Sequence, residues 1–271
     1  MLTYLSGEGR NAMLRRVGMA ALDALYPPRC LTCTAATDRA RGLCPACWSD
    51  THFIAGAACW TCGAPLVGEA GPGDLCETCL AHPPAWDRGA AAILYQGAGR
   101  RAVLALKHCD RLDTVRPLAG WMAAVGRELL ASADLVAPVP LHWRRLVRRR
   151  YNQSAELARA LGAGAGRPVA VDLLRRVRMT RPQERMDRAM RHANQEGALE
   201  VRARHGARIG GKRVLIIDDV LTSGATLSAA AEACRAAGAA RVEVLVLARV
   251  VFPETAWSDP ASWRREEGEA P

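Results

Sequence analysis

Lysine is nearly absent from this 271-residue chain, which contains only Lys107 and Lys212. The net formal charge of +10 therefore comes almost entirely from arginine. Arginine is suited to planar, two-point contacts with phosphate and carboxylate groups. The excess fits an anionic partner, and it fits equally a general preference for arginine on a solvated surface.

Long apolar runs are also missing, and none approaches the roughly 20 residues that a membrane-spanning helix needs. Residues 17–25 are apolar and follow two arginines, but Asp23 interrupts the run and no small-residue cleavage site follows it. We therefore expect no membrane insertion, a cytoplasmic location and reduced cysteines. Half of the residues are hydrophobic, which suits one well-buried domain and a smaller module.

Composition divides the chain into four stretches. We expect a helical leader over residues 1–29, a cysteine-rich module over 30–82, a larger domain over 86–252 and a flexible tail over 253–271. In the larger domain, apolar runs alternate with helical patterns, which is typical of a parallel α/β sheet flanked by helices. The expected strands are Ala90–Leu94, Leu135–Val139, Val169–Leu173, Val214–Ile217 and Val242–Leu247, and the expected helices include Trp121–Leu130, Ser154–Leu161 and Thr226–Ala237.

Eight of the ten cysteines form four Cys-x-x-Cys pairs within residues 30–82. Each pair directs two sulfurs to one point, and two pairs complete a tetrahedral thiolate shell for Zn²⁺. The spacing therefore predicts two closed structural zinc sites without a catalytic role. Pairing in sequence order is the simplest arrangement, and a cross-braced pairing stays open. The predicted ligands are Cys30, Cys33, Cys44, Cys47, Cys59, Cys62, Cys76 and Cys79, whereas Cys109 and Cys234 are expected to bind no metal.

An apolar run at Val214–Ile217 is followed by two aspartates and by small residues that lead into a helix. Open α/β sheets bind ligands at the carboxyl ends of their strands, where the aspartates suit ribose hydroxyls. Small residues let backbone N–H groups approach a phosphate, and the start of a helix adds a favourable dipole. The predicted ligand-binding residues are Asp218, Asp219, Val220, Leu221, Thr222, Ser223, Gly224, Ala225 and Thr226.

The thirteen residues Val214–Thr226 resemble the 5-phosphoribosyl-1-pyrophosphate (PRPP) signature of type I phosphoribosyltransferases. Further motifs resemble the ComF family of competence proteins, which join a double zinc ribbon to a phosphoribosyltransferase domain. Arg150 replaces a glycine of the family pattern, and His108 replaces a tyrosine. The matching motifs are Tyr26–Cys30, Tyr95–Gly97, Ala105–His108, Ala137–His142, Tyr151–Gln153, Thr180–Gln183, Arg191–Asn194 and Leu247–Arg249.

The resemblance implies a type I phosphoribosyltransferase-like sheet that binds PRPP together with Mg²⁺. In such an enzyme, pyrophosphate leaves C1 of the ribose, and cationic side chains stabilise the departing charge. Asp218, Asp219 and Lys107 are the candidate catalytic residues, although Lys107 equally fits a lysine that only extends to solvent. The candidate pyrophosphate loop contains Val139, Pro140, Leu141, His142 and Arg144. Arg175–Arg191, with seven arginines, resembles a mobile lid and fits equally a solvated arginine-rich segment.

The resemblance also implies a role in DNA uptake during natural transformation, with single-stranded DNA and DNA-uptake proteins as partners. One alternative is a non-catalytic adaptor that binds single-stranded DNA and uses the PRPP fold as a sensor. Its support is a run of arginines interleaved with aromatic residues, as in single-strand tracks. The other alternative, nucleotide salvage, ranks last because no base-recognition loop is identifiable. The candidate DNA contacts are Arg144, Arg145, Arg148, Arg149, Arg150 and Tyr151.

Overall fold

The computed structural model describes residues 28–37, 41–108, 112–141, 151–178 and 186–251. The chain divides into two compact units, residues 1–49 and residues 50–271, and we describe each by itself. No helix in these described ranges is long and apolar enough to cross a membrane. The expected leader lies almost wholly outside them, and the expected tail lies wholly outside them.

The first unit is built around its two cysteine turns. An antiparallel bridge joins Arg29 to Ala36, and the backbone N–H of Cys30 donates to the Ala35 carbonyl at 2.8 Å. These bonds close the turn that carries the first cysteine pair. The short helix α2 (Pro45–Ser49) carries one sulfur of the second pair.

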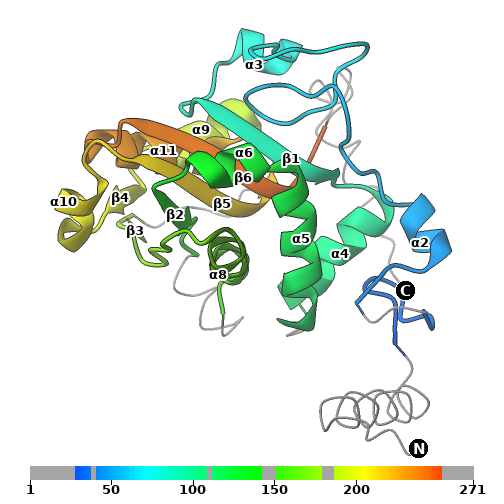
Figure 1. Cartoon of the computed structure of the whole chain (residues 1–271). Helices are drawn as coiled ribbons and strands as arrows, with labels where there is room; N and C mark the ends of the chain where they lie inside the picture. The colour runs from blue at the N-terminus through cyan, green and yellow to red at the C-terminus, as the bar shows by residue number, and fades with distance from the viewer. Residues whose placement is uncertain (1–27, 38–40, 109–111, 142–150, 179–185, 252–271) are drawn as a thin grey trace, which may run out of the picture. The chain divides into compact units, whose positions relative to one another are not determined.

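A four-stranded parallel sheet forms the centre of the second unit (Figure 1). Its strand order is β1 (Arg88–Leu94), β6 (Arg241–Arg249), β5 (Arg213–Leu221) and β2 (Leu135–Pro138). Because all three pairings are parallel, the carboxyl ends of the strands meet at one edge.

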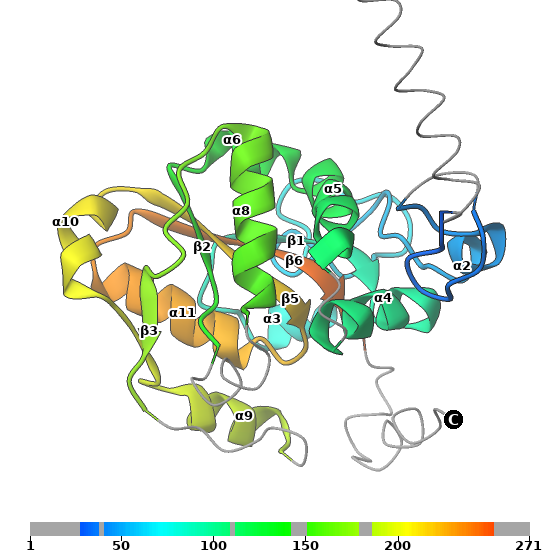
Figure 2. The same cartoon turned by 90° about the horizontal axis from the view of Figure 1, so that it is seen from below.

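Helices cover both faces of the sheet, which explains why its central strands are continuous apolar runs. On β5, Leu215 and Ile217 pack with the helices of one face, whereas Val214 and Ile216 belong to the core on the other face. Figure 2 shows α8 beside the edge strand β2. The first face carries α4 (Gly97–His108), α5 (Val115–Val125), α6 (Arg127–Ser132) and α8 (Gln153–Ala165), and the second carries α11 (Ala225–Ala236) and the second group of cysteines.

A smaller subdomain connects α8 to β5. Strands β3 (Leu174–Arg176) and β4 (Leu199–Val201) form an antiparallel ribbon, and α9 (Arg188–Gln195) packs against α11. Short helices, η2 (Ala203–His205) and α10 (Gly206–Ile209), lead back to the sheet. Two further short elements of the unit are α3 (Glu77–Ala81) and η1 (Leu112–Thr114).

Two expected elements differ from the structure. Residues 169–173 form no strand: Val169 makes one bridge to Val136, and the chain then turns at Asp172, whose carboxylate is bonded by His205. The expected helix Trp121–Leu130 is interrupted at Gly126, which separates α5 from α6. A Cβ at Gly126 would lie 2.6 Å from a methyl group of Leu245 and 3.0 Å from the Met122 carbonyl oxygen, so a larger residue there would have to displace its neighbours.

Candidate functional site

The eight paired cysteines form two clusters, and each cluster lies within one unit. In both, the four sulfurs lie within 4.8 Å of one another, and the pairs combine in sequence order. The Sγ–Sγ distances of 3.6 Å for Cys33–Cys44 and 3.7 Å for Cys62–Cys76 are too long for disulfides. Tetrahedral Zn²⁺ with sulfurs about 2.3 Å away places them about 3.8 Å apart, so both clusters fit closed zinc sites.

Cys234 lies on α11 and is fully buried. Burial raises the pKa of its thiol to about 12, which fits the predicted place of Cys234 in the core. Cys109 lies outside the described residues.

Three charged side chains meet at the carboxyl end of β5. Asp218 and Asp219 are consecutive residues of this strand, and Lys107 reaches them from the last turn of α4. The Lys107 Nζ lies 3.2 Å from Asp219 Oδ2, and both side chains are mostly buried. Lys107 therefore belongs to the aspartate pair and does not extend to solvent.

Asp218 accepts two hydrogen bonds on one carboxylate oxygen. The hydroxyl of Ser154 donates to Asp218 Oδ1 at 2.9 Å, and the backbone N–H of Asp219 donates to the same oxygen at 2.9 Å. Burial and, secondly, the charge of Asp219 raise the pKa of Asp218 to about 7. A carboxyl group that titrates near neutrality at the ligand-binding edge of a sheet is typical of a functional site.

The Tyr-Asn-Gln motif at the start of α8 ties this edge together. Asn152 caps the helix by accepting the N–H of Ser154, and its Nδ2 donates to the Val139 carbonyl at 3.0 Å. Gln153 Nε2 donates to the Lys107 carbonyl at 3.4 Å. The hydroxyl of Tyr151, a candidate DNA contact, donates to a carbonyl of α4 at 2.6 Å. The motif thus fixes Val139 and Lys107 beside the aspartates.

The pyrophosphate-loop candidates begin where β2 ends. Val139 is buried and its N–H donates to the Ile217 carbonyl at 3.0 Å, which places it beside β5. Pro140 and Leu141 follow, half-buried. The other candidates of this stretch and five of the six candidate DNA contacts lie outside the described residues: His142, Arg144, Arg145, Arg148, Arg149 and Arg150.

The phosphate loop, Thr222–Thr226, joins β5 to α11. Gly224 caps the helix with φ of +83°, a left-handed conformation that suits glycine. Ser223 is buried, and its hydroxyl oxygen lies 3.5 Å from the N–H of Ala225. Arg249, at the end of β6, donates to the carbonyl of Thr222 at 2.9 Å. The loop is therefore a short polar turn that leads directly into the N-terminus of a helix.

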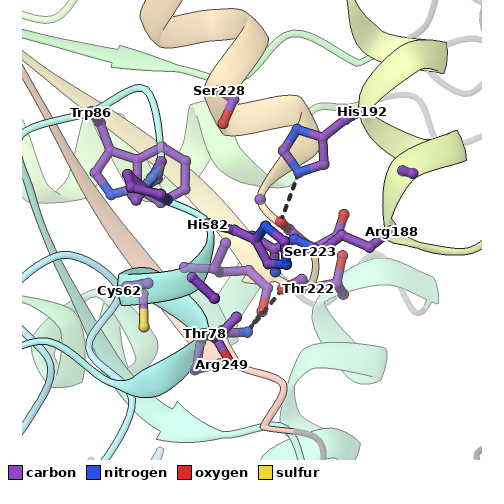
Figure 3. A pocket seen from close by; sticks show the side chains of 17 residues that line it. Cys62, Thr78, His82, Trp86, Arg188, His192, Thr222, Ser223, Ser228 and Arg249 are labelled. Atoms are coloured by element: carbon purple, nitrogen blue, oxygen red, sulfur yellow. Dashed lines mark hydrogen bonds between the residues drawn. The ribbon is translucent and has the colours of Figure 1, made fainter. Parts of the chain in front are cut away.

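A cavity of about 480 Å³ lies beside the phosphate loop (Figure 3). The second cysteine cluster, α9 and the loop all contribute to its wall, and neither the aspartate pair nor Lys107 lines it. His192 Nε2 lies 3.2 Å from the Ser223 carbonyl oxygen, so α9 touches the loop directly. The labelled lining residues are Cys62, Thr78, His82, Trp86, Arg188, His192, Thr222, Ser223, Ser228 and Arg249.

Sequence reasoning missed several of these residues. Ser154 was expected only as part of a helix, and Trp86 was not singled out. Arg249 appeared only as the last residue of a motif without a role. Arg188 and His192 lie in or next to the arginine-rich stretch interpreted as a lid. Burial lowers the pKa of Arg188, so this arginine is not a purely solvated surface charge.

Family models match both parts of the chain. A double zinc ribbon domain matches residues 21–81, and a phosphoribosyl transferase domain matches residues 155–265. DNA utilization protein YhgH of Salmonella typhimurium is 28% identical over 218 residues, which cover 78% of this chain and 91% of that protein. Competence protein F of Haemophilus influenzae is 27% identical over 227 residues, which cover 82% of this chain and 96% of that protein.

Solved structures resemble part of the chain. The allosteric regulatory enzyme of purine biosynthesis covers 53% of this chain and 30% of its own length, with 22% identity and a TM-score of 0.36. A hypoxanthine phosphoribosyltransferase from Staphylococcus aureus covers 53% of this chain and 70% of its own length, with 18% identity and a TM-score of 0.33.

Proposed function

We propose that this chain, which joins a double zinc ribbon to a phosphoribosyl transferase domain as the ComF family does, binds PRPP at the carboxyl end of β5. The observation that carries the proposal is the ion pair of Lys107 with Asp219, shortly before the phosphate loop. One edge of the sheet thus offers three groups to PRPP. The aspartate carboxylates suit the ribose, the Lys107 ammonium suits the pyrophosphate, and the start of α11 suits the 5-phosphate.

Each group has a defined part in binding. The carboxylates of Asp218 and Asp219 accept hydrogen bonds from the ribose hydroxyls, and backbone N–H groups at the start of α11 donate to the 5-phosphate. The Lys107 ammonium faces the pyrophosphate. Hard cations prefer oxygen ligands, so the carboxylate oxygens also suit Mg²⁺ bound together with PRPP. The bound ion would neutralise charge on the leaving pyrophosphate.

If transfer occurs, the bond between C1 of the ribose and pyrophosphate breaks, and an acceptor nucleophile forms a new bond to C1. Positive charge develops on the ribose as in glycoside cleavage, and Lys107 stabilises the negative charge of the departing pyrophosphate. Asp218, with a pKa of about 7, is also suited to hold a proton near this centre. The aspartate pair does not identify the acceptor nucleophile.

The proposed setting is DNA uptake in natural transformation. Its support is the likeness to relatives named DNA utilization protein YhgH and competence protein F over most of their lengths. The second candidate function is a non-catalytic adaptor that binds single-stranded DNA and senses PRPP. Residues 141–151 favour that candidate, because they contain five arginines and no acidic residue.

Titration calorimetry with PRPP and Mg²⁺ tests the binding proposal. The wild-type chain should bind, whereas the double variant Asp218→Ala/Asp219→Ala should show no heat of binding. Arg175→Ala is a matched control, because this arginine pairs with Glu200 on the β3–β4 ribbon. Unaltered binding by the double variant would show that the site lies elsewhere. A screen for pyrophosphate release with bases, ammonia and DNA ends then separates an enzyme from a sensor.

A further inference from the structure

Trp86 connects the second cysteine cluster to the phosphate loop. Its side chain is almost fully buried, and its indole N–H donates to the carbonyl of Thr61, inside the Cys59–Cys62 turn, at 2.6 Å. The far edge of the ring meets Gly224: a Cβ there would lie only 2.9 Å from Trp86 Cη2. One rigid side chain therefore spans the distance from the metal-binding turn to the residue that starts α11.

Arg249 makes a second connection. It is only 7% exposed, and its Nη1 donates to the carbonyls of Leu221 at 3.1 Å and Thr222 at 2.9 Å. Its side chain lines the same cavity as Cys62 (Figure 3) and Cys79. A Zn²⁺ ion held by four thiolates would carry two net negative charges beside the cavity that this guanidinium lines.

The metal-binding turn itself is packed backbone to backbone on the sheet. A Cβ at Gly63 would lie 2.5 Å from the backbone nitrogen of Ala91, and a Cβ at Gly89 would lie 2.3 Å from the Thr61 carbonyl oxygen. The N–H of Gly89 also donates to the Trp60 carbonyl at 3.0 Å. Such close packing leaves the turn little room to move without moving β1 or Trp86.

From these contacts we infer that the second zinc centre holds the phosphate loop in its ligand-binding shape, with Trp86 and Arg249 as positioning residues. Bound zinc would fix the turn that carries Thr61, the partner of the indole, and would add negative charge on the side of the cavity that Arg249 lines. Both side chains then act on residues 221–224 from the side of the loop that faces the cavity. The inference rests on the proposed function only in taking PRPP as the ligand of the loop.

Arg249→Met in the zinc-loaded full chain tests the connection without changing a metal ligand. Native mass spectrometry should still find the wild-type zinc content. Because bonds from a charged donor to two loop carbonyls are lost, PRPP affinity should fall about 10-fold or more. Hydrogen–deuterium exchange of the peptide that spans residues 221–228 should become faster, because the loop and first helical turn lose their restraint.

Arg88→Met is the matched control. Arg88 lies over the Trp60 ring with 4.0 Å to its centroid and pairs with Glu128, so it also joins the zinc ribbon to the sheet but does not touch the loop. This variant should keep wild-type PRPP affinity and loop exchange. Equal effects of Arg88→Met and Arg249→Met would overturn the inference, because they would indicate general destabilisation.

Trp86→Phe gives a second test, because it keeps an aromatic ring in place and removes the indole N–H and the larger size of the indole. Faster loop exchange with retained zinc is the expected result, and unchanged exchange in both Trp86→Phe and Arg249→Met overturns the inference. If wild-type chain fails to bind PRPP, the proposed function is wrong, but the exchange measurement still decides whether the zinc centre restrains the loop.

Discussion

Asp218→Asn should make the folded second unit more stable at pH 8 while it weakens PRPP binding. Asparagine has almost the same shape, and its amide oxygen still accepts the hydrogen bonds that Ser154 and the Asp219 N–H now donate to Oδ1. The substitution removes a charge held beside a like charge in a partly buried place. If Asp218 had only a structural role, the same substitution would lower the stability at pH 8.

The size of the gain follows from the pKa of Asp218, which rises from 3.8 to about 7 on folding. Three pKa units correspond to about 4 kcal/mol at pH 8, which is an upper limit. Asp218 keeps some solvent exposure, and its neighbour Asp219 shares Lys107. We therefore expect a gain of about 1–3 kcal/mol, or roughly 2–12 °C in the melting temperature of the unit.

The pH dependence has a defined sign. Because the folded-state pKa lies above the unfolded value, the folded unit binds the proton more tightly, and the wild-type chain loses stability as pH rises from about 4 to 7. The advantage of Asp218→Asn should thus be greatest at pH 8 and about half as large at pH 5.5. Thermal unfolding followed by fluorescence at several pH values measures it.

Asp219→Asn is the matched control for this experiment. Asp219 pairs with Lys107 at 3.2 Å, so its loss leaves a mostly buried ammonium without that partner, and the variant should gain no stability. A loss of stability in Asp218→Asn at pH 8, or a gain that does not change with pH, would refute the reasoning about the buried carboxyl.

Three further predictions concern the metals, the lysine and the arginine-rich run. Native mass spectrometry should find two zinc ions per chain, and Cys47→Ser should leave one; fewer than two ions in the wild-type chain would contradict the two-site interpretation. Lys107→Met should weaken PRPP binding by about 10-fold in calorimetry, because a charge-assisted contact is lost, and equal affinity would remove Lys107 from the site. If the chain binds single-stranded DNA directly, its affinity should fall steeply with salt, and serine at Arg148, Arg149 and Arg150 should flatten that dependence; a flat wild-type response would favour protein partners.

The sequence was most informative where the chemistry is local. Two Cys-x-x-Cys turns fix their own sulfurs, so spacing alone predicted all eight cysteines of the clusters and the simplest pairing. The parallel sheet is confirmed, and family models match a double zinc ribbon domain over residues 21–81 and a phosphoribosyl transferase domain over residues 155–265. Asp218 and Asp219 were predicted to follow the strand Val214–Ile217 and lie within β5, which extends to Leu221; their role in binding stays a prediction.

Contacts between distant segments could not be predicted in this way. Lys107 reaches Asp219 only because α4 and β5 end at the same edge of the sheet, and Ser154 meets Asp218 only because α8 packs beside β5. The close approach of Gly126 to Leu245 likewise joins the interruption of the expected helix to a residue of β6, far away in the sequence. Such contacts arise from the order of the strands in the sheet, so the periodicity within one segment does not predict them.

The charges at the end of β5 also limit what kind of ligand the site suits. Asp218 and Asp219 share one ammonium, that of Lys107, and burial together with the charge of Asp219 raises the pKa of Asp218. An inorganic phosphate would add negative charge beside an uncompensated carboxylate. A sugar hydroxyl donates a hydrogen bond to it, and a divalent cation neutralises it. A ligand that combines phosphates, ribose and a metal ion answers each of these needs, which favours magnesium-bound PRPP over a simple anion.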